Sequence, residues 1–275
     1  MELHDVLYEA DGGVARITLN RPQYRNAQSY RLLDELDVAL DRAMDDRAVK
    51  VVIVTGAGDH FSSGHDLGTP ESLEDRQARG IPESGIEYYD AFRKYNYDLT
   101  HKWRNLPRPT IAMVRGYCIY GGWMIASAMD LVFASEDALF LAGLFEYFSV
   151  PWDLGPRKTK ELLFESRFIT ATEAHDLGFV NRVYSSDDLE RETVAYARRV
   201  AENGHVPLRM AKLSVNKAMD MQGYSSFVEA AFADYLVQST QRGVARTEGE
   251  RRLNGVDLAL RHLRGQRAGQ PGGGA

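Results

Sequence analysis

The run VVIVTG at residues 51–56 is echoed by TIAMVRG at residues 110–116. Each is a short stretch of apolar, largely β-branched residues, which is typical of a strand buried on both faces of a sheet. Each also ends in a glycine and continues through a loop towards a helix. Because helix-length segments separate these strands, the pattern predicts an α/β fold in which two similar turns lie side by side.

The flanking sequence extends this alternation. Apolar residues at every second position from Ala15 to Leu19 predict a strand, and apolar residues spaced by three and four predict a helix that begins near Ser29. Two further short strands are predicted at residues 131–134 and 138–141, and mostly helices beyond them. The polar segment 68–98 contains several prolines and glycines, so we expect a mobile loop with helical pieces.

Composition excludes several classes of protein. The 275 residues are 44% hydrophobic and 26% charged, with 33 basic and 39 acidic side chains and a formal charge of −6. These are values of a globular chain without general attraction for nucleic acid or anionic membranes. No apolar run has the length of a membrane span. The single cysteine, Cys118, excludes an internal disulfide, and Met1–Asp5 lacks the features of a signal peptide, so a cytoplasmic protein is expected.

Two motifs follow the two buried strands: FSSGHDL at residues 61–67 and GYCIYGGW at residues 116–123. Together with NRP at residues 20–22 upstream, and TATEA at 170–174 and LGFVN at 177–181 downstream, they resemble the crotonase superfamily, the enoyl-CoA hydratases and isomerases. The motifs occur in the family's order and register along most of the chain.

The resemblance implies a crotonase-like spiral of β-β-α units in residues 1–200 and a C-terminal helical trimerisation region in residues 201–265, followed by a flexible tail in 266–275. It also implies a homotrimer or a dimer of trimers and an acyl-CoA substrate. We expect no permanently bound cofactor and no metal, because coenzyme A arrives as part of the substrate.

By the same resemblance, two backbone N–H groups bind the thioester oxygen as it becomes an oxyanion or enolate. They map onto His65 and Gly121. The chemistry is reasonable, since glycine permits close approach of the backbone and a helix start adds a positive dipole. The side chain of His65 is a weaker candidate than its amide.

The departures from the family concern its acid and base groups. Hydratases of the family carry two glutamates, and the corresponding positions here are Met124 and Leu144, neither of which transfers protons. Asp153 lies close to where other branches carry a functional aspartate, so it is the first candidate for general acid or base, with a helix cap as the alternative. Glu146 is the second candidate, and an ordinary surface residue is its alternative.

The substrate pocket is predicted around Tyr120, Trp123, Met124, Leu144 and Trp152. The aromatic residues of this region predict a bulky, cyclic or aromatic acyl group, although aromatic side chains also build cores. Five cations are candidates for contacts with CoA phosphates or for plain solvated surface: Arg104, Arg108, Arg157, Lys158 and Lys160.

The sequence therefore predicts a crotonase-type enzyme that acts on an acyl-CoA through an oxyanion without the two-glutamate pair. The reaction would be that of a lyase, an isomerase, or a hydrolase of C–C or thioester bonds. Two alternatives stay open: hydration by substitute groups such as Asp153, and a non-catalytic acyl-CoA binder.

Overall fold

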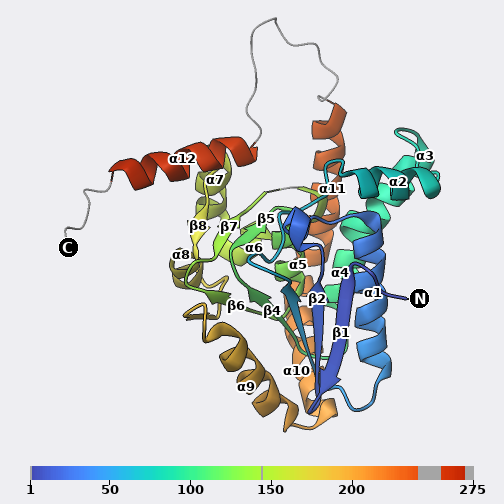
Figure 1. The fold of residues 1–275 in the computed structure, drawn as a ribbon, viewed down its shortest axis with the longest axis vertical. Helices are drawn as coiled ribbons and strands as arrows, with labels where there is room; N and C mark the ends of the chain where they lie inside the picture. Colours follow the sequence, from blue (N-terminus) through green and yellow to red (C-terminus); the bar gives the residue numbers. More distant parts are fainter. Residues whose placement is uncertain (1, 144, 241–254, 270–275) are drawn as a thin grey trace, which may run out of the picture.

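The structure is a computed structural model that describes residues 2–143, 145–240 and 255–269. Its main sheet has six strands in the order β1-β2-β3-β4-β6-β9, and only the β1–β2 pair is antiparallel. The strands are β1 (Val6–Asp11), β2 (Val14–Leu19), β3 (Val51–Gly56), β4 (Thr110–Val114), β6 (Leu131–Ser135) and β9 (Arg182–Tyr184). This is the predicted α/β fold (Figure 1).

The alternating side chains of β3 explain why residues 51–54 are all apolar. Val52 and Val54 belong to the large core beneath helix α1 (Tyr30–Asp45), whereas Val51 and Ile53 pack with helix α9 (Leu189–Ala201) on the other face. Successive strand residues point to opposite faces, so helices on both sides require apolar residues at every position. Helix α1 begins where predicted, since the Ser29 side chain accepts a hydrogen bond from the amide of Leu32.

A second, three-stranded sheet has the order β5-β7-β8 and comprises β5 (Tyr117–Ile119), β7 (Leu139–Leu141) and β8 (Ile169–Thr170). The two predicted turns meet beside β5. The Phe61 amide donates to Arg115 O at 2.9 Å, the Ser62 amide to Tyr117 O at 3.0 Å, and the Ile119 amide to Ser62 O at 3.0 Å. The side-by-side placement of the turns is thus confirmed. Cys118 is fully buried here, and burial raises its pKa, as expected of a packing residue.

The helical pieces predicted within residues 68–98 are confirmed, but they pack against α1 where a mobile loop was expected. After α2 (Pro70–Ala78), the chain forms α3 (Ile86–Arg93), a π-helical turn at Lys94–Asp98 and α4 (Leu99–Arg104) without interruption. Tyr95 is 5% exposed and its hydroxyl donates to Asp34 at 3.0 Å. Asp34 also accepts from Lys94 Nζ at 2.9 Å and pairs with Arg79. Charged side chains that suggested solvent exposure in fact bind this segment to α1.

The remaining helices follow the second turn. They are α5 (Gly121–Ala128), α6 (Val150–Leu154), α7 (Pro156–Glu165), α8 (Ala171–Asp176), α10 (His205–Met221), α11 (Tyr224–Thr240) and α12 (Gly255–Gly269). The cap predicted for α8 is present, because the Thr170 side chain accepts from the Glu173 amide. Helix α12 runs past residue 265, where the tail was predicted to start, and residues 270–275 lie outside the described ranges. The other domain boundaries and the trimerisation role stay predictions.

Among the residues that the structure describes, no helix is long and apolar enough to cross a bilayer. No group of three or more His, Cys, Asp or Glu side chains in these ranges is arranged to hold a metal ion.

Candidate active site

The first turn directs the backbone of His65 by strand-like pairing. The Gln28 amide donates to Gly64 O at 2.8 Å, and the Asp66 amide donates to Gln28 O at 3.0 Å. His65 is the residue opposite Gln28 in this parallel bridge. Because successive residues of an extended chain direct their N–H and C=O groups to alternate sides, the N–H of His65 points away from Gln28.

The second turn is the start of α5, and its glycines are required by close packing on the first turn. A methyl group added at Gly122 would lie 2.8 Å from Ser62 O, and one added at Gly64 would lie 3.2 Å from the Gly121 nitrogen. Gly121 is the first residue of α5, whose opening N–H groups have no acceptor within the helix. The structure thus brings the backbones of residues 64–65 and 121 together at a helix N-terminus.

Gln28 is a residue of this site that sequence reasoning missed. Its Nε2 donates to Ser62 Oγ at 3.2 Å, and its Oε1 lies where a methyl group on Gly121 would clash. The side chain therefore fills the space behind both turns. Its position between a predicted strand and a predicted helix cap gave no chemical signal.

Asp153 lies in α6, beside α5. Its Oδ2 accepts hydrogen bonds from Trp123 Nε1 at 2.8 Å and from Ser149 Oγ at 2.7 Å. Trp123 is held in place by stacking on Phe179, with ring centroids 4.1 Å apart. Burial raises the pKa of the Asp153 carboxyl to about 6, and the two hydrogen bonds oppose this rise only in part. A carboxyl group with this pKa can both accept and release a proton near neutral pH.

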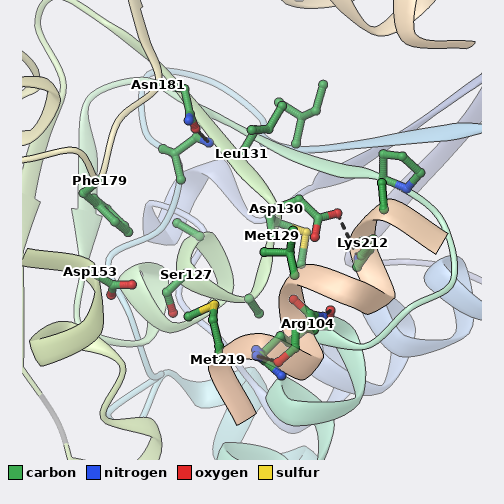
Figure 2. Close-up of a pocket in the computed structure, with 18 of the residues that line it drawn as sticks. Arg104, Ser127, Met129, Asp130, Leu131, Asp153, Phe179, Asn181, Lys212 and Met219 are labelled. Carbon is green, nitrogen blue, oxygen red and sulfur yellow. Dashed lines mark hydrogen bonds and ion pairs between the residues drawn. The ribbon is translucent and has the colours of Figure 1, made fainter. Parts of the chain in front are cut away.

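A cavity of about 590 Å³ opens beside Asp153. It extends along the C-terminal half of α5 to α10, and most of its wall is apolar (Figure 2). Asp153, Trp152 and Ser127 line it, whereas His65 and Gly121 do not. On the side of the cavity away from Asp153, Lys212 Nζ pairs with Asp130 at 2.9 Å. Asp153 is therefore reached from the flank of α5, and the two paired turns lie at the first residue of the same helix.

Comparison with known proteins decides the family. The model of the enoyl-CoA hydratase/isomerase family matches residues 9–249. The chain belongs to that family. A curated relative from Mycobacterium tuberculosis that carries an enoyl-CoA hydratase name, EchA13, is 39% identical over 253 residues, which are 84% of this chain and 79% of the relative.

Solved structures agree with this assignment. A probable enoyl-CoA hydratase from Mycobacterium thermoresistibile has 38% identity and a TM-score of 0.78, covering 86% of this chain and 96% of that one. An enoyl-CoA hydratase/isomerase from Xanthobacter autotrophicus Py2 has 33% identity and a TM-score of 0.78, covering 96% and 99%. The predicted fold and the expectation of a crotonase-type enzyme are confirmed.

The resemblance to enoyl-CoA hydratases and isomerases implies glutamates at two positions that hold Met124 and Leu144 in this chain. Met124 is 3% exposed and packs in an aromatic cluster with Tyr147 and Tyr224. Leu144, the second position, lies outside the described residues. Burial raises the pKa of both tyrosines, so their hydroxyls, 3.3 Å apart, stay neutral.

The predicted pocket residues take different places. Trp152 lines the cavity, but Trp123 is 1% exposed and packs in the main core. Tyr120 is partly buried and precedes Gly121 with φ 49° and ψ −103°, and its hydroxyl lies against Gly255 at the start of α12. The aromatic residues therefore pack mainly against one another, and they give little support to an aromatic acyl group.

Glu146 is not the surface residue considered as its alternative. It is 2% exposed, in the short 3-10 helix Phe145–Tyr147. Two of the candidate CoA cations are also buried: Arg104 pairs with Asp220 at 3.1 Å and lies over the Tyr224 ring, and Arg108 donates to Ala43 O. Both arginines hold the fold together, and Arg104 also lines the cavity, whereas the cations of α7 remain on the exterior.

Proposed function

We propose that this chain is an enzyme that acts on an acyl-CoA thioester. The N–H groups of His65 and Gly121 bind the thioester oxygen as negative charge develops, and Asp153 transfers the proton. The acyl-CoA substrate is consistent with the family and with the enoyl-CoA hydratase names of its relatives.

The observation that carries the proposal is the pairing of the two turns. A methyl group at Gly64 would lie 2.8 Å from Ile119 O and 3.2 Å from the Gly121 nitrogen, and one at Gly121 would clash with the Gln28 side chain, so both positions leave only backbone beside the N-terminus of α5. Fixed amides need no reorganisation when charge appears, so they stabilise a transition state more than a neutral thioester. The helix dipole adds to this preference for negative charge.

The proton transfer follows from the carboxyl group at Asp153. As a base, the carboxylate takes a proton from the acyl group, and the electron pair of the broken C–H bond moves towards the carbonyl, whose oxygen becomes the enolate. Returning the proton to another carbon of the enolate completes an isomerisation. Giving it to the oxygen of a β-hydroxyl group while the bond between that oxygen and the β-carbon breaks releases water and completes an elimination. The pKa of about 6 suits both directions at neutral pH.

The two-glutamate route of hydration has no counterpart in this proposal. Met124 is a thioether among aromatic rings, and residue 144 is leucine. General acid and base groups contribute about 10²- to 10⁴-fold each, so we expect slow hydration of crotonyl-CoA. A rate near the ~10⁸ M⁻¹s⁻¹ diffusional ceiling would show that the acid and base groups are elsewhere.

Calorimetric titration with crotonyl-CoA and with crotonate tests the assignment. The proposal requires tight binding of the thioester and far weaker binding of the free acid, because the turns are built around a thioester oxygen and its pantetheine arm. Equal affinities, or no binding of either ligand, would contradict it.

We also propose assembly into trimers or pairs of trimers. Helix α10 supports this proposal because it leaves large apolar side chains exposed, including Val206 at 66%, Val215 at 62% and Met221 at 83%. Light scattering on the purified chain measures the assembly directly.

A further inference from the structure

The His65 amide is held by a bridge whose two sides are fastened to one buried arginine. Nη1 of Arg21 donates to Ala27 O at 2.7 Å and to Asp66 Oδ2 at 2.8 Å. Ala27 precedes Gln28 and Asp66 follows His65, which are the two residues opposite each other in the bridge. One nitrogen atom therefore fixes the spacing of the two segments that set the direction of the amide.

The partner carboxylate is fully enclosed. The side chain of Asp66 is 0% exposed and that of Arg21 is 1% exposed. Asp66 also accepts from the amides of Gly68 and Thr69, at 3.0 and 2.8 Å, and from the Thr69 hydroxyl at 2.6 Å. Burial would raise the pKa of Asp66, but these bonds and Arg21 lower it below the usual value. The turn after His65 is thus fixed around an ionised carboxylate.

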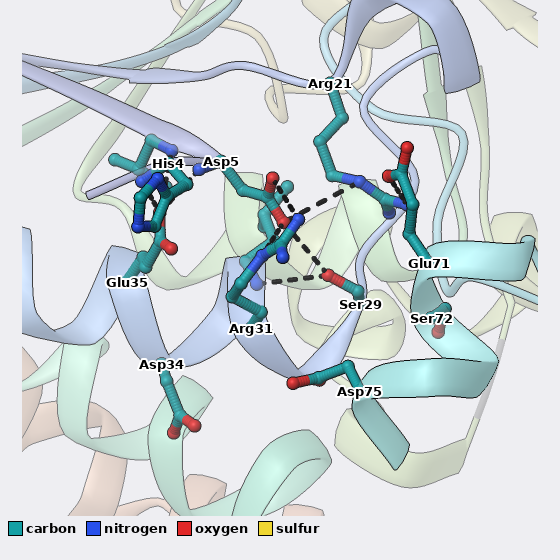
Figure 3. Close-up of polar contacts among 12 residues, drawn as sticks. His4, Asp5, Arg21, Ser29, Arg31, Asp34, Glu35, Glu71, Ser72 and Asp75 are labelled. Carbon is teal, nitrogen blue, oxygen red and sulfur yellow. Dashed lines mark hydrogen bonds and ion pairs between the residues drawn. The ribbon is translucent and has the colours of Figure 1, made fainter. Parts of the chain in front are cut away.

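Arg21 also belongs to a longer chain of charges, which includes Glu71 at 3.4 Å from its Nη2 (Figure 3). Its Nε lies 3.7 Å from Asp5 Oδ2, and Asp5 accepts two bonds of 2.9 Å from Arg31. The carboxylate of Glu35 accepts from the amides of residues 4, 5 and 6. The N-terminal segment therefore places a second acid beside the arginine that holds the turn.

Stability alone does not account for this arrangement. Apolar residues of similar volume often replace a buried ion pair without loss of stability, because desolvation offsets much of the attraction. What a guanidinium adds is geometry, since its planar fork bonds several oxygens in fixed directions. Here those oxygens belong to the two segments that flank the oxyanion turn.

We propose that Arg21 is a positioning residue, and that its buried pair with Asp66 fixes the direction of the His65 N–H. This inference rests on the proposed function, in which that N–H binds the thioester oxygen. Loss of the pair would leave the amide present but misdirected, so the enolate would lose affinity while the neutral thioester would keep most of its own.

The test measures, without turnover, how much more tightly the protein binds the enolate of a ligand than its neutral form. This ratio is the enolate preference. Acetoacetyl-CoA is a β-ketoacyl thioester that ionises reversibly to an enolate with its own ultraviolet absorption. Titrating the bound ligand with pH gives its apparent pKa, and each unit below the value of the free ligand is a tenfold preference for the enolate. We expect the wild type to lower this pKa. We expect Arg21→Lys to reduce the enolate preference about 10- to 100-fold, which is at or below the effect of deleting one oxyanion donor. Affinity for the neutral thioester should stay nearly unchanged.

Arg31→Lys is the matched control. It removes the paired bonds to Asp5 in the same network, but Arg31 does not contact Asp66. Its enolate preference should equal that of the wild type. A folded Arg21→Lys variant with wild-type preference overturns the inference and leaves the proposed function intact. A wild type without any preference contradicts the proposed function itself, and the inference falls with it.

A second variant applies if Arg21→Lys does not fold. Thr69→Ala keeps both charges but removes the hydroxyl that donates to Asp66 and accepts from Arg21 Nη2 at 3.0 Å. A several-fold loss of enolate preference supports the positioning role. A preference within about twofold of wild type, at a normal circular dichroism spectrum, overturns it.

Discussion

The start of α5 and the flank of α5 are built in different ways. At the start, the site consists of backbone, because Ile119 O leaves no room for a side chain at Gly64 and the Gln28 side chain leaves none at Gly121. On the flank, it consists of side chains, with Asp153 bonded to Trp123 and Ser149. Backbone donors do not change charge with pH, whereas a carboxyl with a pKa of about 6 does. In the proposed reaction, the first region stabilises charge and the second region moves protons.

The largest effect is expected on the side-chain flank. Asp153→Asn keeps the shape and the hydrogen bonds but removes the base, so kcat on the true substrate should fall about 10²- to 10⁴-fold with little change in thioester affinity. Steady-state kinetics together with calorimetry measure both quantities.

Asp130→Asn is the control for this variant, because Asp130 lines the same cavity but pairs with the buried Lys212. It should lower the melting temperature and leave kcat near normal. An Asp153→Asn enzyme with full kcat and a normal melting temperature would mean that Asp153 only supports the helix, and the assignment would pass to Glu146 or to the His65 side chain.

A somewhat smaller effect is expected at the backbone end. Gly64→Ala would place a methyl group 2.8 Å from Ile119 O and 3.2 Å from the Gly121 nitrogen, which separates the two turns. Loss of one oxyanion donor costs about 10²- to 10³-fold in kcat, and the Gly64→Ala rate should fall in that range.

Gly85→Ala is the matched control, since both glycines have φ 90° but a methyl at Gly85 meets only the end of the Glu87 side chain, at 3.4 Å. Both variants place a side chain at a φ of 90°, but only Gly64→Ala disturbs the two turns, so only Gly64→Ala should lose turnover. Equal rates for the two variants would show that the close approach of the turns has no part in the reaction.

The smallest effect is a pH dependence of stability. Folding raises the Asp153 pKa from 3.8 to about 6, so the native state favours the protonated form. This contribution to stability is complete below pH 3.8 and disappears as pH rises through about 6. Urea denaturation across this pH range gives the free energy of unfolding as a function of pH. The contribution that the wild type loses as pH rises through about 6 should be absent from Asp153→Asn, so the two plots should differ in shape. Parallel curves would indicate an ordinary pKa.

The regions also differ in how far the sequence predicted them. The turns were predictable because their determinants are local: a buried strand, a glycine and a helix start recur twice within a few residues. Helix α1 and its Ser29 cap were predictable for the same reason. Hydrophobic periodicity therefore predicted the sheet, and short motifs predicted the two turns that the structure brings together.

Contacts between distant segments were not predictable. Trp123 and Asp153 are 30 positions apart, and Arg21 and Asp66 are 45 apart, so no spacing rule connects them. The segment around Tyr95 was misjudged because its charged neighbours pair with Asp34 on α1, a contact that composition does not reveal. These side-chain contacts needed the fold, whereas the two backbone turns did not.

The most direct test of the account is a crystal structure of the protein with a bound acyl-CoA thioester. The account predicts the thioester oxygen about 2.7–3.1 Å from the nitrogens of both His65 and Gly121, with the acyl group extending along α5 towards the Asp153 carboxyl. A thioester oxygen bound instead inside the cavity between α5 and α10, away from both amides, would contradict it.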